Sequence, residues 1–179
     1  MRKIKLYIAM SLNGQIAQKD GSVQWLEDIP NPEQSDYGYF AFYDSIGTTI
    51  QGNSTYQQIL GWDIDFPYAD KENYVLTSNA DAVDTEYVRF VRSDHSNFIK
   101  NLKETEGDDI WLIGGGGANT SLLNAGLIDE IHIHVMPIIL SDGIALFSAF
   151  PKETSLQLID SKSYPSGVVE MRYVTTSGR

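Results

Sequence analysis

Residues 110–123, IWLIGGGGANTSLL, contain an apolar string, four consecutive glycines and then a segment with a helical pattern. The apolar string Ile110–Ile113 is typical of a strand buried on both faces. Glycines between a strand and a helix leave backbone N–H groups unpaired at the helix start, where a phosphate can approach closely. Glycines also occur where a chain only turns tightly. The spacing matches neither GxGxxG nor GxxxxGK[ST], so the run alone leaves the anion cradle and the tight turn equally open.

Strand and helix patterns alternate on both sides of this stretch. β-Branched and aromatic residues predict strands at Ile4–Met10, Thr48–Gln51, Tyr74–Thr77, Val88–Val91, Ile110–Ile113 and Glu130–Ile139. Apolar periodicity and end signals predict helices at Ser35–Asp44, Ser54–Leu60, Ser96–Gly107 and Asn119–Ala125. Such alternation favours a mainly parallel sheet covered by helices on both faces.

The pattern changes after Leu146. Leu156–Ser161 and Val168–Thr175 have strand composition, and the turn residues Tyr164–Gly167 join them. These features predict an antiparallel hairpin at one edge of the sheet. Because no repeat, low-complexity tract or linker interrupts the chain, residues 1–179 are predicted to form a single domain.

Composition excludes several classes of function. The chain of 179 residues has no cysteine, which removes disulfides, thiolate metal sites and cysteine nucleophiles. The formal net charge of −11 at pH 7 argues against nucleic acid as a partner. The apolar run that follows the basic start, MRKIKLYIAM, is too short for a membrane span and predicts a first strand. We therefore expect a cytoplasmic protein with no membrane partner.

Five motifs occur in order and cover most of the chain. They are IAMSLNGQIA at residues 8–17, GNSTY at 52–56, YVLTSN at 74–79, IWLIGGGG at 110–117 and LIDEIHIHVMPIIL at 127–140. Together they resemble the dihydrofolate reductase-like family, in particular the branch of the C-terminal reductase domain of the bifunctional riboflavin-biosynthesis deaminase/reductase. The resemblance implies a three-layer α/β/α fold with a mixed sheet, mainly parallel, and a C-terminal antiparallel hairpin. It also implies a reductase that passes hydride from NADPH to a small heterocyclic or carbonyl-like substrate.

The resemblance also implies where the cofactor binds. Beside the nicotinamide it places Ala9, Ile16 and Ala17, although plain core packing also suits such apolar residues. Toward the pyrophosphate and adenosine it places Gly52, Asn53, Ser54 and Thr55. At the adenosine end it places Thr77, Ser78 and Asn79. Around the pyrophosphate it places Gly115, Gly116, Gly117, Ala118 and Asn119.

One acid is the candidate proton relay. Asp36 stands four residues before Phe40 and sixteen before Gly52, the interval found for the buried acid of the reductases that the chain resembles. The resemblance implies that Asp36 orients a substrate N–H group or relays a proton, provided that burial raises its pKa. An acid in the first turn of a helix also occurs for dipole reasons alone.

Three residues are expected to contact the substrate by the same resemblance: Ser11, Trp25 and Phe40. Trp62 is a second tryptophan that could stack on a planar substrate, and either tryptophan could instead fill the core. The polar loop Gln18–Ser22, which contains a glycine, has the composition of a lid and equally that of a surface turn.

Two histidines share a strand face with Glu130 and Met136. His132 and His134 could bind a metal with Glu130, but no remaining ligands are evident and we expect no metal. His134 matches the position from which dihydrofolate reductases present a threonine to their acid and pterin. It is therefore a candidate to hydrogen-bond Asp36 or the substrate, and a buried neutral histidine is an equally consistent interpretation.

The departures from the family pattern bear on ligand choice. Asn53 and Ser78-Asn79 stand where the family carries arginines that grip the 2′-phosphate of NADPH, so NADH is a possible alternative cofactor. No arginine lies between Trp62 and Tyr74 to pair with a folate carboxylate. These differences favour a smaller or uncharged substrate.

Two classes of function follow. The first is a nicotinamide-dependent reductase, and the second is a nucleotide-binding or regulatory module of the same fold that has lost catalysis. The aromatic segment Tyr37–Tyr43 exceeds what one helix face needs for a core. A homodimer contact or a substrate wall could use the excess.

Overall fold

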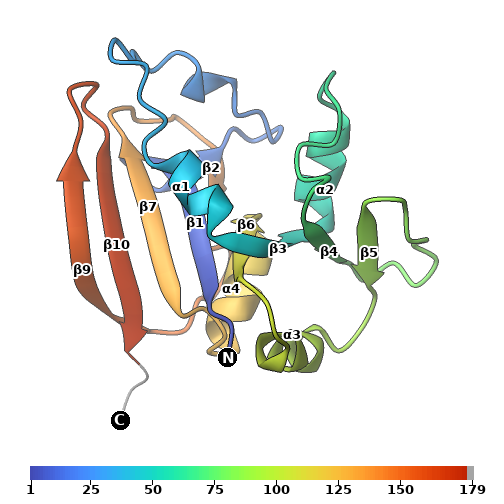
Figure 1. The fold of residues 1–179 in the computed structure, drawn as a ribbon. Helices are drawn as coiled ribbons and strands as arrows, with labels where there is room; N and C mark the ends of the chain where they lie inside the picture. Colours follow the sequence, from blue (N-terminus) through green and yellow to red (C-terminus); the bar gives the residue numbers. More distant parts are fainter. Residues whose placement is uncertain (177–179) are drawn as a thin grey trace.

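The computed structural model describes residues 1–176, which form an eight-stranded sheet in the order β5-β4-β3-β6-β1-β7-β10-β9 (Figure 1). Its strands are β1 Ile4–Ser11, β3 Ile46–Gly52, β4 Glu72–Leu76, β5 Val88–Val91, β6 Asp109–Gly114, β7 Glu130–Met136, β9 Ser155–Ser163 and β10 Val169–Thr176. The short strands β2 (Gln15–Ala17) and β8 (Ile144–Ala145) form a separate two-stranded sheet.

The direction of the strands changes near one edge. β1 runs parallel to β6 and β7, β3 runs parallel to β4 and β6, and β4 runs parallel to β5. β10 is antiparallel to both β7 and β9. The expected mixed sheet, mainly parallel and with a C-terminal antiparallel hairpin, is confirmed.

Helices cover both faces of the sheet. One face carries α1 (Tyr39–Asp44) and α2 (Asn53–Leu60), and the opposite face carries α3 (His95–Glu104) and α4 (Gly116–Asn124) (Figure 1). The largest apolar core lies under α3 and α4, where Ile99 and Leu122 pack on the alternate residues Ile4 and Leu6 of β1. Burying such a side chain completely contributes about 1.5–3 kcal/mol. The three-layer arrangement fixes the strand ends from which the cleft described below is built.

Several expected boundaries differ from the structure. The first helix begins at Tyr39 rather than Ser35, because Tyr37 (φ 52°) and Gly38 (φ 83°) adopt left-handed conformations that a helix cannot contain. β7 ends at Met136 because Pro137 lacks the N–H group that would continue the ladder. β2 and β8 were not predicted, since strands of two or three residues carry almost no periodic signal. Within residues 1–176, none of the helices has the length and apolar character needed to cross a membrane.

Candidate functional site: a cleft at the carboxyl end of the parallel strands

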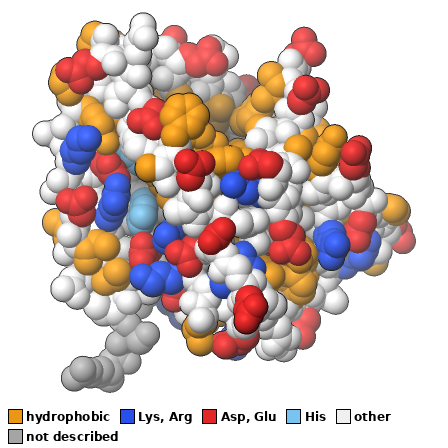
Figure 2. Space-filling view, in the orientation of Figure 1, with side chains coloured by type: hydrophobic (Ala, Val, Ile, Leu, Met, Phe, Trp, Pro, Cys, Tyr) orange, Lys and Arg blue, Asp and Glu red, His pale blue; other side chains and the backbone are white. Residues whose placement is uncertain are grey.

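A cleft of about 740 Å³ lies at the carboxyl end of the parallel strands. In the orientation of Figure 1 it opens at the top, between the segment after β2 and α2, and Figure 2 shows the molecule hollowed there. Its walls come from β1, β2, β6, the starts of α2 and α4, and the segment that contains residues 19–26. Ligands of open α/β sheets commonly bind at this edge.

Two helices begin at the cleft without a side-chain cap. The N-cap of α2 is Gly52 and that of α4 is Gly115, and neither position makes a side-chain hydrogen bond to the first turn. Ser54 and Thr55 from α2 and residues 116–118 from α4 line the cleft. Unpaired N–H groups and the positive ends of two helix dipoles therefore meet in one place, which favours a phosphate or another anion.

The four glycines have different roles. Gly114 (φ 129°) and Gly115 (φ 92°) adopt backbone conformations that other residues rarely reach, and a Cβ on Gly115 would stand 2.8 Å from Thr55 Oγ1. A Cβ on Gly116 would stand 2.5 Å from the carbonyl oxygen of Ala145. Gly117 is different, because its Cβ would meet no atom within 4 Å. The fold itself requires the first three glycines, and the fourth leaves open space in the cleft.

The other end of the cleft is mainly apolar. Ala9 and Ile113 form part of the wall, with Ile59, Trp62 and Tyr68 nearby. Trp62 is 39% exposed, whereas Tyr68 is 7% exposed and packs edge-on against Trp111 at a centroid distance of 5.3 Å. Burial raises the pKa of Tyr68 above its usual value, so its phenol stays neutral and can donate a hydrogen bond.

A polar loop borders the same space. Lys19, Asp20 and Gly21 line the cleft, and the side-chain amide of Gln58 in α2 donates a hydrogen bond to the carbonyl of Gly21. This contact joins the loop to a helix that also forms the anion-favouring end. The Lys19 ammonium lies 3.4 Å from an Asp142 carboxylate oxygen, and both side chains are largely exposed.

The cleft gathers many of the residues expected at a cofactor site. Those that line it are Ala9, Ile16, Ala17, Ser54, Thr55, Gly115, Gly116, Gly117 and Ala118. The expected residues outside its lining are Gly52, Asn53, Thr77, Ser78, Asn79 and Asn119. Asn119 is fully buried in α4, and its amide donates to the carbonyl of Leu146 over 2.8 Å. That bond fixes the segment that precedes Phe147, so the side chain of Asn119 has a structural role.

The expected burial of Asp36 is wrong. Its carboxylate is exposed and accepts hydrogen bonds of 3.0 Å from the backbone N–H groups of Gly38 and Phe40. These bonds hold the pKa of Asp36 below its usual value, where an acid is a poor proton donor at neutral pH. Asp36 stabilises the turn that starts α1 and does not line the cleft. The alternative interpretation, an acid placed for the helix start, fits its position.

The three expected substrate contacts also lie elsewhere. Ser11 is fully buried, and its hydroxyl donates to Asn13 over 2.7 Å and accepts from the Gln15 N–H group. Trp25 packs in the core with Met136, and Phe40 is 67% exposed, outside the cleft. Motif spacing alone suggested that Trp25 and Phe40 contact the substrate. The later start of α1 places Phe40 outside the cleft, and the packing of residues 23–29 places Trp25 in the core. The aromatic segment Tyr37–Tyr43, which contains Phe40, was expected to form a homodimer contact or a substrate wall. The homodimer contact stays a prediction.

His134 lies beside the cleft rather than in it. Its side chain is 3% exposed, and its Nε2 atom is 3.0 Å from the carbonyl oxygen of Tyr37 and 3.9 Å from a Glu170 carboxylate oxygen. Burial lowers the pKa of His134, although Glu170 opposes this shift. The neutral imidazole therefore holds the Tyr37 segment on the sheet, and Asp36, its expected partner, makes no such contact.

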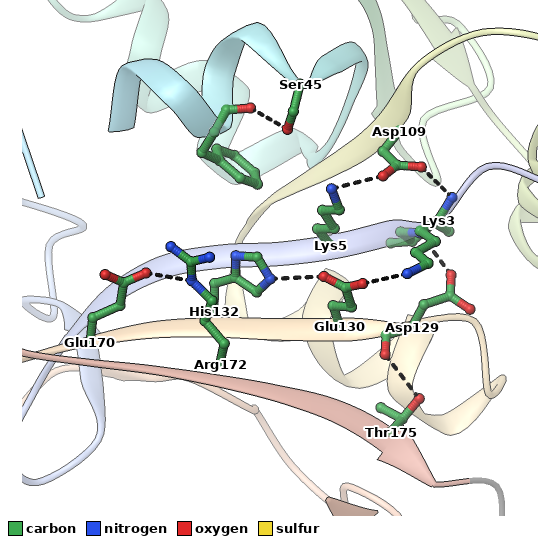
Figure 3. A network of polar contacts seen from close by, with 12 residues as sticks. Lys3, Lys5, Ser45, Asp109, Asp129, Glu130, His132, Glu170, Arg172 and Thr175 are labelled. Carbon is green, nitrogen blue, oxygen red and sulfur yellow. Dashed lines mark hydrogen bonds and ion pairs between the residues drawn. The ribbon is translucent and has the colours of Figure 1, made fainter. Parts of the chain in front are cut away.

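Charged residues form a network on the same sheet face (Figure 3). Glu130 bridges Lys3 and His132 at 2.8 and 3.0 Å, and the guanidinium of Arg172 donates to Glu170 over 2.7 Å. Figure 2 shows this mixture of charges, with a histidine, at the surface over β7 and β10. Among residues 1–176, no group of His, Asp and Glu side chains has the arrangement of a metal site. The network consists of ion pairs between Lys3 and Glu130 and between Arg172 and Glu170, and of a hydrogen bond between His132 and Glu130.

The fold and the cleft define a class, the α/β proteins with a dihydrofolate reductase-like mixed sheet. Residues 66–170 match the model of the RibD C-terminal domain family, and the chain belongs to this family. The chain is 38% identical over 173 residues to uncharacterized protein YwjB of Bacillus subtilis (strain 168), covering 97% of this chain and 98% of that protein. A second protein of that strain, YyaP, is 29% identical over 96% of this chain.

Solved structures have the same fold. A candidate riboflavin biosynthesis protein from Shewanella sp. PV-4 is 30% identical, with a TM-score of 0.86 over 99% of this chain and 100% of that one. A Thermotoga maritima deaminase/reductase matches 98% of this chain with 57% of its own length, at a TM-score of 0.75 and 14% identity. Enterococcus faecalis dihydrofolate reductase, complexed with NADP(H), matches at a TM-score of 0.65 and 17% identity. The last two likenesses show the fold alone.

Sequence reasoning missed much of the apolar end. Tyr68 comes from a long loop and Ile113 from a strand whose outward face could not be chosen before the sheet order was known. Gln58 could have been found from the 3.6-residue period of α2, because it follows Ser54 and Thr55 on adjacent turns. Trp62 was one of two tryptophans considered, and it is the one that the structure places in the cleft.

Proposed function

We propose that this chain is a nicotinamide-dependent reductase that transfers hydride to a small, uncharged heterocyclic or carbonyl-like substrate. One observation carries the proposal: two uncapped helix N-termini meet in a cleft whose other end is apolar. A dinucleotide needs both kinds of surface, one for its diphosphate and one for its nicotinamide ring. Membership of a reductase-like family supports the proposal.

The residues present fit the diphosphate. The backbone N–H groups of Gly116 and Gly117 begin α4, and the hydroxyls of Thr55 and Ser148 line the same part of the cleft. Open space above Gly117 allows an oxyanion to approach the backbone. These groups would hold the two phosphates by hydrogen bonds and helix dipoles, without a bidentate arginine.

The apolar end would hold the nicotinamide and the substrate. Ala9 and Ile113 offer small or flat surfaces, and Trp62 offers an aromatic face for a planar ring. When bound, the cofactor supplies a hydride to the acceptor atom of the substrate, and a proton completes the two-electron reduction. The protein aligns the two rings and keeps water from between them, which accounts for much of the rate in such reactions.

Tyr68 is the proposed hydrogen-bond donor to the substrate. Its phenol lines the cleft and is neutral because burial raises its pKa. It can therefore donate to an oxygen or nitrogen atom on which negative charge develops. The substrate is proposed to be uncharged because Lys19 is the only cationic side chain among the residues that line the cleft within residues 1–176, and it is paired.

Binding of a dinucleotide tests the proposal directly. Trp62 lies in the cleft, whereas Trp25 and Trp111 are 3% and 6% exposed, so a bound nicotinamide should quench the emission of Trp62. We expect saturable quenching by NADH or NADPH with the full chain, and loss of most of the signal in Trp62→Phe. If neither dinucleotide binds at millimolar concentration in a calorimetric titration, the reductase proposal is wrong.

A second function is a nucleotide-binding or regulatory module without turnover. The specific observation that favours it is the position of Asp36, which lies outside the cleft and carries a lowered pKa. Asp20, in the exposed loop, is the one carboxylic acid among the described residues that line the cleft. Tight dinucleotide binding without oxidation of the reduced cofactor by any of a panel of pyrimidine, pteridine and quinone acceptors would favour this second function.

A further inference from the structure

The inference concerns which dinucleotide the cleft selects, and it rests on the proposed function. The sheet order β5-β4-β3-β6-β1 places the loops after these strands in a row along the carboxyl edge. The apolar wall belongs to β1 and β6 through Ala9 and Ile113, and the start of α2 follows β3. A dinucleotide with its nicotinamide on the apolar wall therefore extends its adenosine half past α2 toward the loops after β4 and β5.

These two loops contain one Lys or Arg side chain, and it is hydrogen-bonded to other groups of the protein. Loops 77–87 and 92–94 contain Arg92 as their single Lys or Arg residue, together with the acids Asp81, Asp84, Glu86 and Asp94. The guanidinium of Arg92 donates to the carbonyl of Ala82 over 2.7 Å and to Asp84 over 3.2 Å. At the opposite end of the cleft, Lys19 is paired with Asp142. Among residues 1–176, the lining of the cleft and these two loops thus present no unpaired cation, and the exposed Arg89 lies within β5 rather than in either loop.

The start of α2 adds a neutral side chain. Asn53 is the first residue of α2 and precedes Ser54, which lines the cleft. An amide at this position can hydrogen-bond a ribose hydroxyl but carries no charge. A phosphate monoester carries about −1.5 to −2 charges at neutral pH. Proteins that accept a 2′-phosphate commonly place an arginine there, whereas an acid or amide suits the free 2′-hydroxyl.

We propose that the cleft selects NADH over NADPH. The diphosphate common to both is held by backbone N–H groups and hydroxyls at the starts of α2 and α4. The additional 2′-phosphate of NADPH would lose water in a protein of formal net charge −11 and gain no cation in return, because Arg92 is engaged by Ala82 and Asp84 and Lys19 by Asp142. Asn53 and the engaged Arg92 are the residues that set this choice.

The test compares the dissociation constants of NADH and NADPH for the full chain, by calorimetry and tryptophan quenching. We expect NADH to bind at least about tenfold more tightly at low salt, and the ratio to shrink at high salt because repulsion is screened. Asn53→Arg should strengthen NADPH binding about tenfold and change NADH binding less than about threefold. Asn53→Gln, the uncharged control of similar length, should leave the ratio unchanged.

The outcomes separate the inference from the proposed function. If NADPH binds as tightly as NADH or more tightly, the inference is overturned and the reductase proposal stands. If neither binds, both are overturned. Circular dichroism checks that Asn53→Arg is folded, and the comparison on the unmodified chain decides the inference even if that variant does not fold.

Discussion

Ala9 on β1 lies directly across from His134 on β7 and shares a sheet face with it, but only Ala9 reaches the cleft. His134 is held behind the wall by the carbonyl of Tyr37, 3.0 Å from its Nε2 atom. The strand position that the resemblance assigns to substrate contact thus anchors the segment before α1.

Replacement of His134 separates an anchoring role from a catalytic one. His134→Leu should reduce the free energy of unfolding by about 1–3 kcal/mol, because the part-buried carbonyl of Tyr37 loses its shorter hydrogen bond and keeps only the 3.4 Å bond from the Tyr7 hydroxyl. Chemical denaturation measures this change, and His134→Gln should restore part of the loss. Dinucleotide affinity should change less than about threefold. If the His134→Leu variant is fully stable and binds cofactor but has no turnover, the anchoring role is contradicted and a catalytic role of His134 is supported.

The stability of the fold should depend on pH near the histidine range. Burial lowers the pKa values of His132 and His134 below 6.5, so the unfolded chain binds more protons than the folded protein between the lowered values and 6.5. The free energy of unfolding should therefore be fully developed above about pH 6.5 and fall as the pH decreases. Denaturation midpoints at pH 7.5, 6.5 and 5.5 measure the trend.

A double variant gives the control for this pH dependence. His132→Gln with His134→Gln should flatten the slope between pH 7.5 and 5.5, because neither glutamine titrates. An unchanged slope in the double variant would contradict the assignment to these histidines, because the pKa values of Glu130 and Glu170 are lowered from 4.5 and these carboxylates titrate below this pH range.

Neighbouring glycines should respond in opposite ways to the same substitution. Gly116→Ala should destabilise the protein by about 1–3 kcal/mol, since the new methyl group would stand 2.5 Å from the backbone oxygen of Ala145. Gly117→Ala should stabilise α4 by up to about 1 kcal/mol, because its methyl group meets no protein atom. It should nevertheless weaken dinucleotide binding. Thermal melts and nucleotide titrations on both variants measure the contrast, and equal affinities for Gly117→Ala and the unmodified chain would contradict the diphosphate site.

The phenol of Tyr68 should matter for turnover more than for binding. Tyr68→Phe keeps the ring that packs on Trp111 and removes only the hydroxyl. We expect kcat on an identified substrate to fall about 10- to 1,000-fold, with the dinucleotide dissociation constant nearly unchanged. Tyr43→Phe, which alters a phenol outside the cleft, serves as a matched control. An unchanged kcat would show that the Tyr68 hydroxyl does not hydrogen-bond the atom on which negative charge develops.

Asp36 should tolerate loss of its charge. Asp36→Asn keeps one of the two oxygens that accept from the N–H groups of Gly38 and Phe40, and the residue lies outside the cleft, so turnover should stay within about threefold of the unmodified value. Steady-state kinetics on the same substrate measure this. A loss of a hundredfold or more in kcat with intact nucleotide binding would contradict the assignment of Asp36 to the turn.

The fold and the glycine-lined end of the cleft followed from the sequence because both depend on local signals. A strand, a glycine run and a helix lie next to one another in residues 110–123, and the same is true of β3, Gly52 and α2. The apolar end of the cleft did not follow from the sequence, since Tyr68 and Ala9 come to line the same cleft only after distant segments pack. The expected burial of Asp36 was wrong for a local reason. Tyr37 and Gly38 adopt left-handed conformations, so the helix begins after Asp36 and does not carry its side chain inward.

The run of four glycines in residues 114–117 carries two kinds of information. Glycine is required at three of its positions by the backbone conformation and packing of this chain, independently of any bound nucleotide. Gly117 alone is free of that requirement. In sequence comparisons within the family, the residue at this fourth position should therefore distinguish members that hold a diphosphate from members that retain only the architecture.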